Sequence, residues 1–319
     1  MILILSTPTD PDTEGVIDWL EMTNTPYFRL NDEDIISGKV DFFYNPIDDN
    51  QTHFKSVNQI IYLSEVKVIW YRKFGFLKSY EVEFGKSSDI VNYLYKEFNT
   101  ICKLIFSILD SKIWLFKKVN MLTKLEILKI AYDIGLNIPP SIVTAKKDNL
   151  IPFFNVNKPL MSKSIGNGSA ISYKDSTFYF YTIKIKSINK ITEKFTPSLF
   201  QKYIQKEYEI RIFYIDGLFY SMVIFSQKNE KTKNDFRNYD SINPNRYEPY
   251  MLPKEIETKL DLLMRKIGIN TGSIDMIKTP KGDYYFLEVN PSGQFGMTAL
   301  PCNFPLYKVV ADFLIKNSS

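Results

Sequence analysis

The sequence contains very few of the residues on which many catalytic and structural metal sites depend. Its 319 residues include a single histidine, His53, and two cysteines, Cys102 and Cys302. Two cysteines cannot form a disulfide framework, and a zinc site of Cys and His ligands lacks its donors. One histidine, far in sequence from any acid or nucleophile cluster, argues against Ser-His-Asp and Cys-His hydrolysis. Any chemistry must therefore rest on lysine, arginine, carboxylates and metal, and His53 is expected to be an ordinary strand or surface residue.

Long apolar runs and a strong charge imbalance are also missing. No apolar run approaches the length of a membrane span, and residues 1–5 lack the basic start and long apolar core of a signal peptide. The formal charge of +4, from 40 basic and 36 acidic residues, does not indicate nucleic-acid binding, although it suits an acidic partner. We therefore expect a cytoplasmic protein that binds neither membranes nor nucleic acid.

Two familiar phosphate-binding loops are absent as well. The chain has no G-x-x-x-x-G-K-[ST] loop and no G-x-G-x-x-G turn, so the P-loop and Rossmann interpretations are rejected. A different phosphate cradle is available where Gly166-Asn167-Gly168 follows Lys163, although a plain hairpin turn is the alternative. Lys124 begins an expected helix, where the dipole is already positive, and a bound phosphate would remove this conflict.

The composition and the order of the expected elements indicate a globular chain of two or three domains. Hydrophobic residues make up 45% of the sequence and aromatic residues 15%. Residues 1–115 alternate strand-like and helix-like runs, including VDFFY at 40–44 and QIIYL at 59–63, which predicts an α/β domain with a largely parallel sheet. Residues 116–195 are typical of a β-rich lobe, and residues 196–319 form a further lobe.

A long helix is predicted after Ser88-Asp89, which can cap it. Apolar residues recur at helical spacing as far as Ile108, and we interpret them as core positions rather than a cofactor site. They are Ile90, Tyr93, Leu94, Ile101, Leu104, Ile105 and Ile108.

Residues 273–290 predict a β-hairpin that brings acidic side chains together. Two β-rich runs flank Pro280-Lys281-Gly282-Asp283, which has Pro and Gly where a tight turn needs them. A turn centred between Lys281 and Gly282 places Asp275 directly opposite Glu288. Asn290 then shares their face, because strand side chains alternate with period two.

Two opposed carboxylates repel one another unless a positive charge lies between them. Oxygen ligands suit a hard cation, and a small number of protein ligands completed by substrate phosphates is typical of Mg²⁺. The sequence therefore predicts a magnesium site at Asp275, Glu288 and Asn290, with a solvated hairpin face as the alternative.

Two arginines and a polar loop complete the candidate residues. Arg211 alternates with Glu209 and Phe213 on an expected strand, where charged side chains usually face solvent. Residues 227–250 show no apolar periodicity, and this segment is too long for a loop that only connects two elements of a compact domain. We therefore expect an active-site or substrate loop. Arg237 lies in this loop, where a solvated charge is the alternative interpretation.

Taken together, these residues in this order resemble an ATP-grasp ligase, over essentially the whole chain. That family holds ATP between two α+β lobes behind an N-terminal α/β domain. The resemblance implies ATP and Mg²⁺ as cofactors, and a mixed α/β and α+β fold with domains at 1–115, 116–195 and 196–319.

The family pattern falls on particular residues of this chain. Its first nucleotide lysine, eleven positions before a helix-ending glycine, falls on Lys124 before Gly135. Its second lysine falls on Lys163, and its ribose-binding acid on Glu209. The metal triad falls on Asp275, Glu288 and Asn290, and the adenine hinge, which acts through backbone groups, falls on Gln201, Lys202, Tyr203 and Ile204.

Three segments are similar to the ligases that make graspetides, particularly the grasp-with-spasm maturases: WYRK at 70–73, SQKNEKTKNDFRNYD at 226–240 and LEVNPSGQFGMTALPCN at 287–303. Those enzymes join Asp or Glu side chains of a precursor peptide to Ser or Thr hydroxyls, or to Lys amines, as macrocyclic esters or amides. The implied partner is a ribosomal peptide with a leader and a core containing Thr or Ser and Glu or Asp. A homodimer is also considered.

The resemblance implies that a peptide carboxylate attacks the γ-phosphate to give an acyl phosphate, which a hydroxyl of the same peptide captures. Ser273 stands where ligases of the D-alanine type have arginine, so Arg211 and Arg237 are expected to act at the reacting centre, with Asp235 orienting Arg237 or assisting deprotonation. Residues 293–295 are expected to line the cleft. The alternatives are a glutamate or other amino-acid ligase that extends a protein tail, and a non-catalytic nucleotide-binding module.

Overall fold

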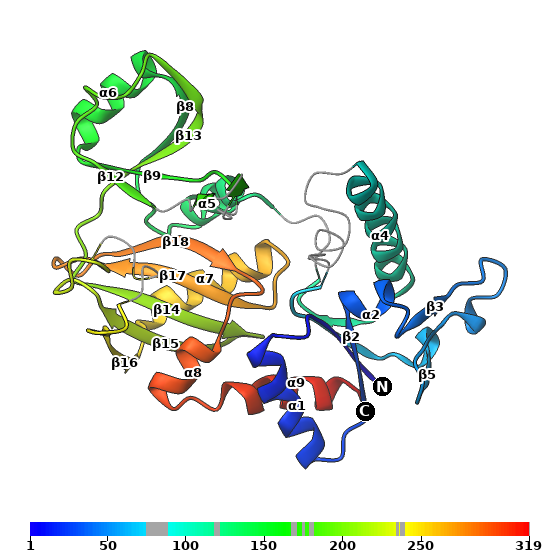
Figure 1. Ribbon diagram of the computed structural model, residues 1–319. Coiled ribbons are helices and arrows are strands. Elements are labelled where there is room, and N and C mark those ends of the chain that lie inside the picture. The colour runs from blue at the N-terminus through cyan, green and yellow to red at the C-terminus, as the bar shows by residue number, and fades with distance from the viewer. Residues whose placement is uncertain are drawn as a thin grey trace. The chain divides into compact units, whose positions relative to one another are not determined.

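The computed structural model describes residues 1–74, 89–117, 122–166, 171–173, 176–178, 182–233, 236 and 240–318. The chain divides into two compact units (Figure 1). Unit 1 comprises Met1–Val119, Ser292–Ala299 and Phe304–Ser319, and unit 2 comprises Asn120–Pro291 and Leu300–Asn303. Within the described ranges, no helix combines the length and apolar character needed to cross a bilayer. The division at 1–115, 116–195 and 196–319 stays a prediction.

Unit 1 is built on a four-stranded parallel sheet, which confirms the predicted α/β character. The strand order is β2-β1-β6-β7, with β1 at Ile2–Ser6, β2 at Tyr27–Asn31, β6 at Val68–Tyr71 and β7 at Ile113–Leu115. Every residue of β1 and β6 is buried, as expected for parallel strands covered on both faces. Helices α1 (Pro11–Met22) and α9 (Leu306–Ser318) pack against each other, and α9 also contacts β1 and β6. Short elements are α2 (Asp32–Ile36), η1 (Asp49–Gln51) and η2 (Leu63–Glu65).

The runs VDFFY and QIIYL form strands, but outside the parallel sheet. They contribute β3 (Asp41–Phe43) and β5 (Ile60–Tyr62) to a separate antiparallel sheet, with β4 (His53–Lys55) between them. The ring of His53 packs between the rings of Phe43 and Tyr62. His53 is therefore an ordinary strand residue, as predicted.

The predicted long helix is α4, Asp89–Ile108, but part of its predicted core is wrong. Ile90 and Tyr93 are 56% and 60% exposed. The buried positions include Val91 and Phe98 instead, together with Cys102 and Ile105. Apolar residues cover more than one face of this helix, so their spacing identifies a helix without fixing which row faces the core.

The first part of unit 2 is a small antiparallel lobe. Its sheet has the order β12-β9-β13-β8, with β8 at Ser141–Lys146, β9 at Leu160–Lys163, β12 at Ile183–Ile185 and β13 at Lys194–Lys202. Helix α6 (Lys147–Asn157) packs on it through Leu150 and Phe154. Helix α5 (Lys124–Asp133) precedes this sheet, and β10 (Ile171–Tyr173) pairs with β11 (Ser176–Phe178).

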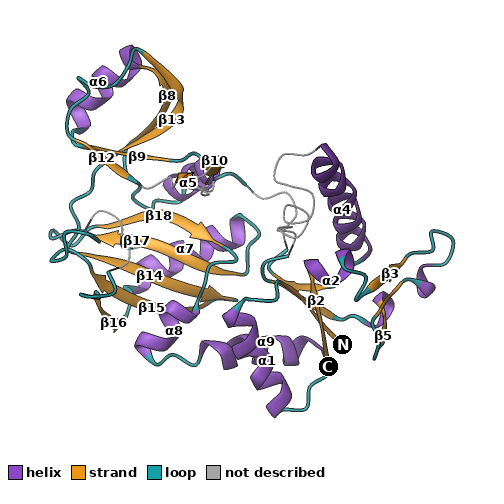
Figure 2. Cartoon of the chain, in the orientation of Figure 1, coloured by secondary structure: helices purple, strands orange, loops and turns teal. Residues whose placement is uncertain are grey.

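The second part of unit 2 is a five-stranded antiparallel sheet in the order β16-β15-β14-β17-β18. Its strands are β14 (Tyr208–Ile215), β15 (Leu218–Phe225), β16 (Arg246–Tyr250), β17 (Thr271–Lys278) and β18 (Tyr284–Asn290). Helix α7 (Lys254–Lys266) covers one face, where Tyr214 donates to Asp261 of the helix at 2.7 Å (Figure 2). Side chains alternate along β14, so Glu209 and Arg211 lie on the opposite face. Helix α8 (Gly296–Cys302) follows β18.

Candidate functional site

The predicted hairpin is present, and Asp275 lies directly opposite Glu288. The predicted turn centre is wrong, however. Thr279 N–H donates to the Asp283 carbonyl at 2.9 Å and Gly282 has a φ of 92°, so the loop is the three residues Pro280-Lys281-Gly282, centred on Lys281. A β-bulge then adds one residue to β18 between the partners of Met276 and Asp275. This extra residue restores the predicted pairing at Glu288.

The bulge lies where β18 borders a pocket. Its extra residue is Leu287, and both Leu287 and Glu288 line that pocket. Bulges of this kind commonly re-aim side chains beside functional sites.

Each of the two opposed carboxylates is paired with a basic side chain. Arg211 lies opposite Asp275 on β14, and its Nη1 donates to both carboxylate oxygens at 2.8 and 2.7 Å. Lys124 forms an ion pair with Glu288. Arg211 is buried, so the alternative that this strand-borne charge faces solvent is wrong. The two cations relieve the carboxylate repulsion that the hairpin creates.

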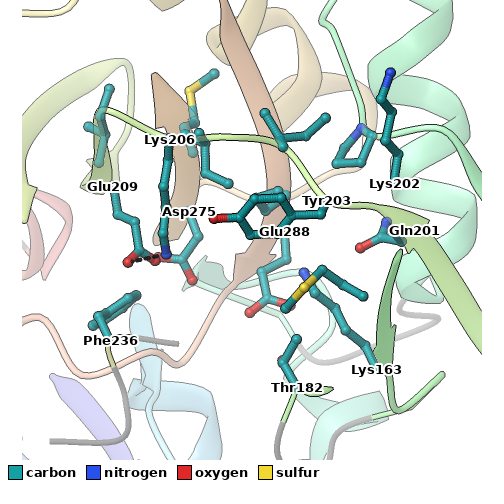
Figure 3. Close-up of a pocket in the computed structure, with 17 residues that line it drawn as sticks. Lys163, Thr182, Gln201, Lys202, Tyr203, Lys206, Glu209, Phe236, Asp275 and Glu288 are labelled. Atoms are coloured by element: carbon teal, nitrogen blue, oxygen red, sulfur yellow. Dashed lines mark hydrogen bonds and ion pairs between the residues drawn. The ribbon is translucent and has the colours of Figure 1, made fainter. Parts of the chain in front are cut away.

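A pocket in unit 2 brings together most of the residues predicted for the nucleotide (Figure 3). The predicted residues that line it are Lys163, Gln201, Lys202, Tyr203, Ile204, Glu209, Asp275 and Glu288. Lys124 and Arg211 are outside this lining but bind two of its acids. Asn290 is paired with Ser273 on the neighbouring strand, beyond the lining residues. Figure 3 shows Lys206 between Glu209 and Asp275, and Lys163 extending toward Glu288.

The pocket is lined by both apolar and charged residues. The aliphatic and methionine residues of the lining are Met161, Ile204, Ile210, Met276, Ile277 and Leu287, and its charged residues are Lys163, Lys202, Lys206, Glu209, Asp275 and Glu288. Such a mixed lining suits a ligand with a flat apolar group and an anionic tail.

The hinge, residues 201–204 at the end of β13, is held in place by backbone hydrogen bonds to neighbouring segments. The N–H groups of Lys202 and Tyr203 donate to the carbonyls of Pro140 and Pro159 at 2.8 and 2.9 Å. These two amides therefore fix the hinge and are not offered to a ligand. The Lys184 ammonium also lies over the Tyr203 ring, with its Nζ 3.3 Å from the ring centroid.

Glu209 is a deeply buried acid of the pocket, 7% exposed like Asp275. Lys206 Nζ and Ser226 Oγ both donate to its Oε1 at 2.7 Å. Burial raises the pKa of Glu209 above its ordinary value, and the neighbouring Lys206 charge opposes that rise. Lys206 was not predicted from the sequence, where its position three residues before Glu209 was the available signal.

The predicted loop residues have different outcomes. Asp235 and Arg237 lie outside the described residues, as do Asn167 and Gly168 of the predicted cradle. Phe236 is described, is 9% exposed and lines the pocket. Residues 293–295 are not among the lining residues, and the Phe295 ring packs against Trp70 and Tyr307 in unit 1.

The donor set at the hairpin fits a hard cation. Among the described residues, no three His, Cys, Asp or Glu side chains are grouped as a metal site. The predicted ligands are instead two carboxylates and one amide, all with oxygen donors. This set is too small for an all-protein cage and suits Mg²⁺ that completes its shell with phosphate oxygens.

Two solved structures similar to this chain are of peptide-modifying enzymes. One is the macrocyclase MdnC of Microcystis aeruginosa bound with precursor peptide MdnA, at 25% identity over 99% of this chain and 100% of that chain, with a TM-score of 0.84. Another is a RiPP-associated ATP-grasp ligase of Chryseobacterium gregarium in complex with ADP and a leader and core peptide. It is 26% identical over 99% of this chain and 96% of that chain, with a TM-score of 0.85.

A third structure supports the fold alone. The ATP-grasp ligase PsnB, complexed with minimal precursor, Mg and ADP, is 14% identical over 100% of this chain and 97% of that chain, with a TM-score of 0.81. No protein-family model and no curated protein matches the sequence.

Proposed function

We propose that this chain, which has the ATP-grasp fold of the peptide macrocyclases it resembles in structure, is an ATP-dependent ligase acting on a ribosomally made precursor peptide. It activates Asp or Glu side chains as acyl phosphates and joins them to Thr or Ser hydroxyls, or to Lys amines, in macrocyclic esters or amides. The observation that carries the proposal is the pocket, which brings the hinge residues together with Glu209, Asp275 and Glu288. The MdnC and Chryseobacterium structures, both bound to peptide, support the substrate class.

The pocket offers a separate group for each part of ATP. The Lys202 and Tyr203 amides are engaged, so Ile204 N–H is the hinge donor that we assign to adenine, with Met161 and Leu287 beside it. The hydrogen bonds from Lys206 and Ser226 to Glu209 both end on Oε1, and we assign Oε2 to a ribose hydroxyl. Lys124 and Lys163 are assigned to the phosphates, because an ammonium suits an oxyanion as a point charge.

Asp275, Glu288 and Asn290 are the proposed ligands of Mg²⁺. Bound MgATP supplies the γ-phosphoryl group that turns a carboxylate into a leaving group, and the protein contributes positioning and charge neutralisation. Donor and acceptor belong to one bound peptide, so ring closure is effectively a unimolecular step.

Arg211 is the described residue best suited to meet the reacting peptide carboxylate. Its Nη1 is bound to Asp275, but its Nε is buried without a hydrogen-bond partner among the described residues. A buried guanidinium N–H with no acceptor is costly, so a ligand oxygen would stabilise it. Arg237 and Asp235 stay proposals for the same chemistry. Cytoplasmic location and a homodimer also stay predictions, and light scattering of the purified chain tests the second.

The variant Glu288→Gln tests the proposal. It keeps the side-chain volume but removes a charged metal ligand, so we expect peptide-dependent ADP release to fall at least about 100-fold, beyond the 10- to 100-fold that outer-shell changes cost. Circular dichroism and thermal unfolding should remain close to those of the wild type. Full ring formation by this variant would contradict the assignment.

A further inference from the structure

The side chain of Gln201 reaches the pocket of unit 2 from the middle of a row of paired residues. Gln201 lies on β13, directly opposite Ser141 of β8 on one side and Met161 of β9 on the other. Directly paired residues of neighbouring antiparallel strands share a face of the sheet, so the three side chains form one row. Met161 and Gln201 line the pocket, and Gln201 is only 2% exposed. A nearly buried amide therefore lies in the wall of the proposed nucleotide site.

Hydrogen bonds determine which way this amide is turned. Ser141 Oγ donates to the Pro139 carbonyl at 2.6 Å, and a carbonyl only accepts, so the single hydroxyl proton of Ser141 is used there. The Ser141 oxygen then accepts from Gln201, whose Nε2 lies 3.0 Å away. An amide oxygen in that position would face an oxygen that has no proton left to donate. The amide nitrogen of Gln201 is therefore fixed on the Ser141 side.

The amide oxygen of Gln201 faces the other lining side chains. Figure 3 shows this oxygen on the side of Tyr203 and Lys163. Among the described residues, the hydrogen bond of the Gln201 side chain is the one from Nε2 to Ser141, and Oε1 accepts none. An acceptor in a nearly buried residue is costly to leave unpaired, so an N–H group of a ligand would stabilise it.

The backbone around this contact is fixed as well. The rings of Pro139 and Pro140 restrict the φ angles that precede Ser141. Lys202 N–H, directly after Gln201, donates to the Pro140 carbonyl at 2.8 Å. Rotation of the terminal amide is therefore the main freedom left to Gln201, and the Ser141 hydroxyl opposes it.

An acceptor in this wall distinguishes two classes of purine base. Adenine carries an amino group at its 6-position, which donates, whereas guanine and hypoxanthine carry an oxygen there, which accepts. Oε1 of Gln201 would bind the amino group and be repelled by the oxygen. An amide turned the other way would present Nε2 and favour the oxygen instead.

We propose that Ser141 is a positioning residue that makes the pocket select 6-aminopurine nucleotides, because it holds the Gln201 amide with its oxygen toward the base. The inference rests on the proposed function, in which this pocket holds ATP. The competing explanation is that the Ser141 hydroxyl only stabilises the pairing of β8 with β13. A freed amide should accept a 6-oxopurine better, whereas a weakened strand pair should impair the binding of every nucleotide.

The test compares Ser141→Ala with Ser198→Ala in the full chain. Ser198 also lies on β13 and donates to a backbone carbonyl, that of Thr196, at 2.8 Å, but it is not among the lining residues. Binding of ATP and of inosine triphosphate, which has the 6-oxygen, is measured by competition with a fluorescent ATP analogue. The N1–H of inosine is common to all measurements, so differences between variants report the 6-position.

The wild type should prefer ATP by at least about tenfold, since the 6-oxygen leaves Oε1 unpaired. In Ser141→Ala we expect ATP to bind about threefold more weakly and inosine triphosphate about threefold more tightly, because the amide can turn to suit either base. Ser198→Ala should keep the wild-type ratio. Ser141→Thr retains the hydroxyl and should keep that ratio too.

A second variant covers the case in which Ser141→Ala does not fold. Gln201→Met removes both polar atoms of the amide, and its preference for ATP should fall in the same titrations. Equal weakening of both nucleotides in Ser141→Ala, or equal binding of both by the wild type, would overturn the inference. A wild-type chain that binds neither nucleotide would instead contradict the proposed function.

Discussion

At the scale of single residues, the site depends on charges that neutralise one another in a buried place. Lys206 is 6% exposed and forms the ion pair that compensates Glu209. Sequence reasoning located Glu209 but missed Lys206, because a lysine three residues from an acid is an ordinary pattern on a surface. The ion pair is important because both of its side chains are buried. Whether a particular polar residue is buried cannot be predicted from the local sequence.

Lys206→Met should destabilise the protein in a pH-dependent way. Losing the lysine charge raises the pKa of Glu209 further, so above the ordinary carboxyl pKa the folded state binds a proton that the unfolded chain lacks. The free energy of unfolding then falls as pH rises. We expect a loss of about 3 kcal/mol near neutral pH, and less in mild acid, from denaturant unfolding. The double variant Lys206→Met/Glu209→Gln should remove the pH dependence, whereas an equal loss at every pH would refute this role.

At the scale of elements, the hairpin of β17 and β18 shows what a pattern can and cannot predict. Its strands, its turn residues and the pairing of Asp275 with Glu288 follow from alternation and turn chemistry. The three-residue loop and the bulge at Leu287 do not, because an extra residue leaves no mark in a period-two pattern. The two deviations cancel at the proposed metal ligands, which explains why Asp275 pairs with Glu288 as predicted although the turn centre differs from the prediction.

Gly282 fixes the turn of this hairpin. Its φ of 92° lies in the left-handed region, so Gly282→Ala should lower the free energy of unfolding by about 1 kcal/mol. Gly166→Ala is the matched control, since a Cβ atom there meets no atom of the described residues within 4 Å and its φ is not in that region. Thermal unfolding of both variants checks this expectation, which fails if the two lose the same stability.

At the scale of the whole molecule, the resemblance of the candidate residues, in their order, to ATP-grasp ligases predicted the fold, and the solved structures confirm it. The contacts of Arg72, in the segment WYRK, were not predictable, because its guanidinium donates to the carbonyls of Ser292 and Gly293, which lie 220 and 221 positions away in sequence. Contacts of that span arise from the complete fold and leave no local signal.

The ion pairs of Arg211 and Lys124 with the two carboxylates predict that Mg²⁺ and ATP bind cooperatively. Arg211 and Lys124 already neutralise Asp275 and Glu288, the two carboxylates proposed to bind metal. Mg²⁺ alone would compete with these cations, whereas ATP phosphates offer Lys124 a new partner. We expect Mg²⁺ alone to leave the unfolding temperature unchanged, and MgATP to raise it more than ATP in EDTA does. Lys124→Met should weaken ATP binding in EDTA while allowing Mg²⁺ alone to bind more tightly. Independent, additive effects of the two ligands would contradict this coupling.

The central claim is that this chain uses ATP to close rings within a peptide. Its most direct test is the intact mass of a short peptide encoded beside its gene, with Thr and Glu or Asp clusters, after incubation with the chain, ATP and Mg²⁺. The account predicts loss of one water mass per ring, with one ADP formed for each. A gain of amino-acid residue masses would indicate a tail-extending ligase instead, and ATP binding without any change in peptide mass would contradict ligase chemistry altogether.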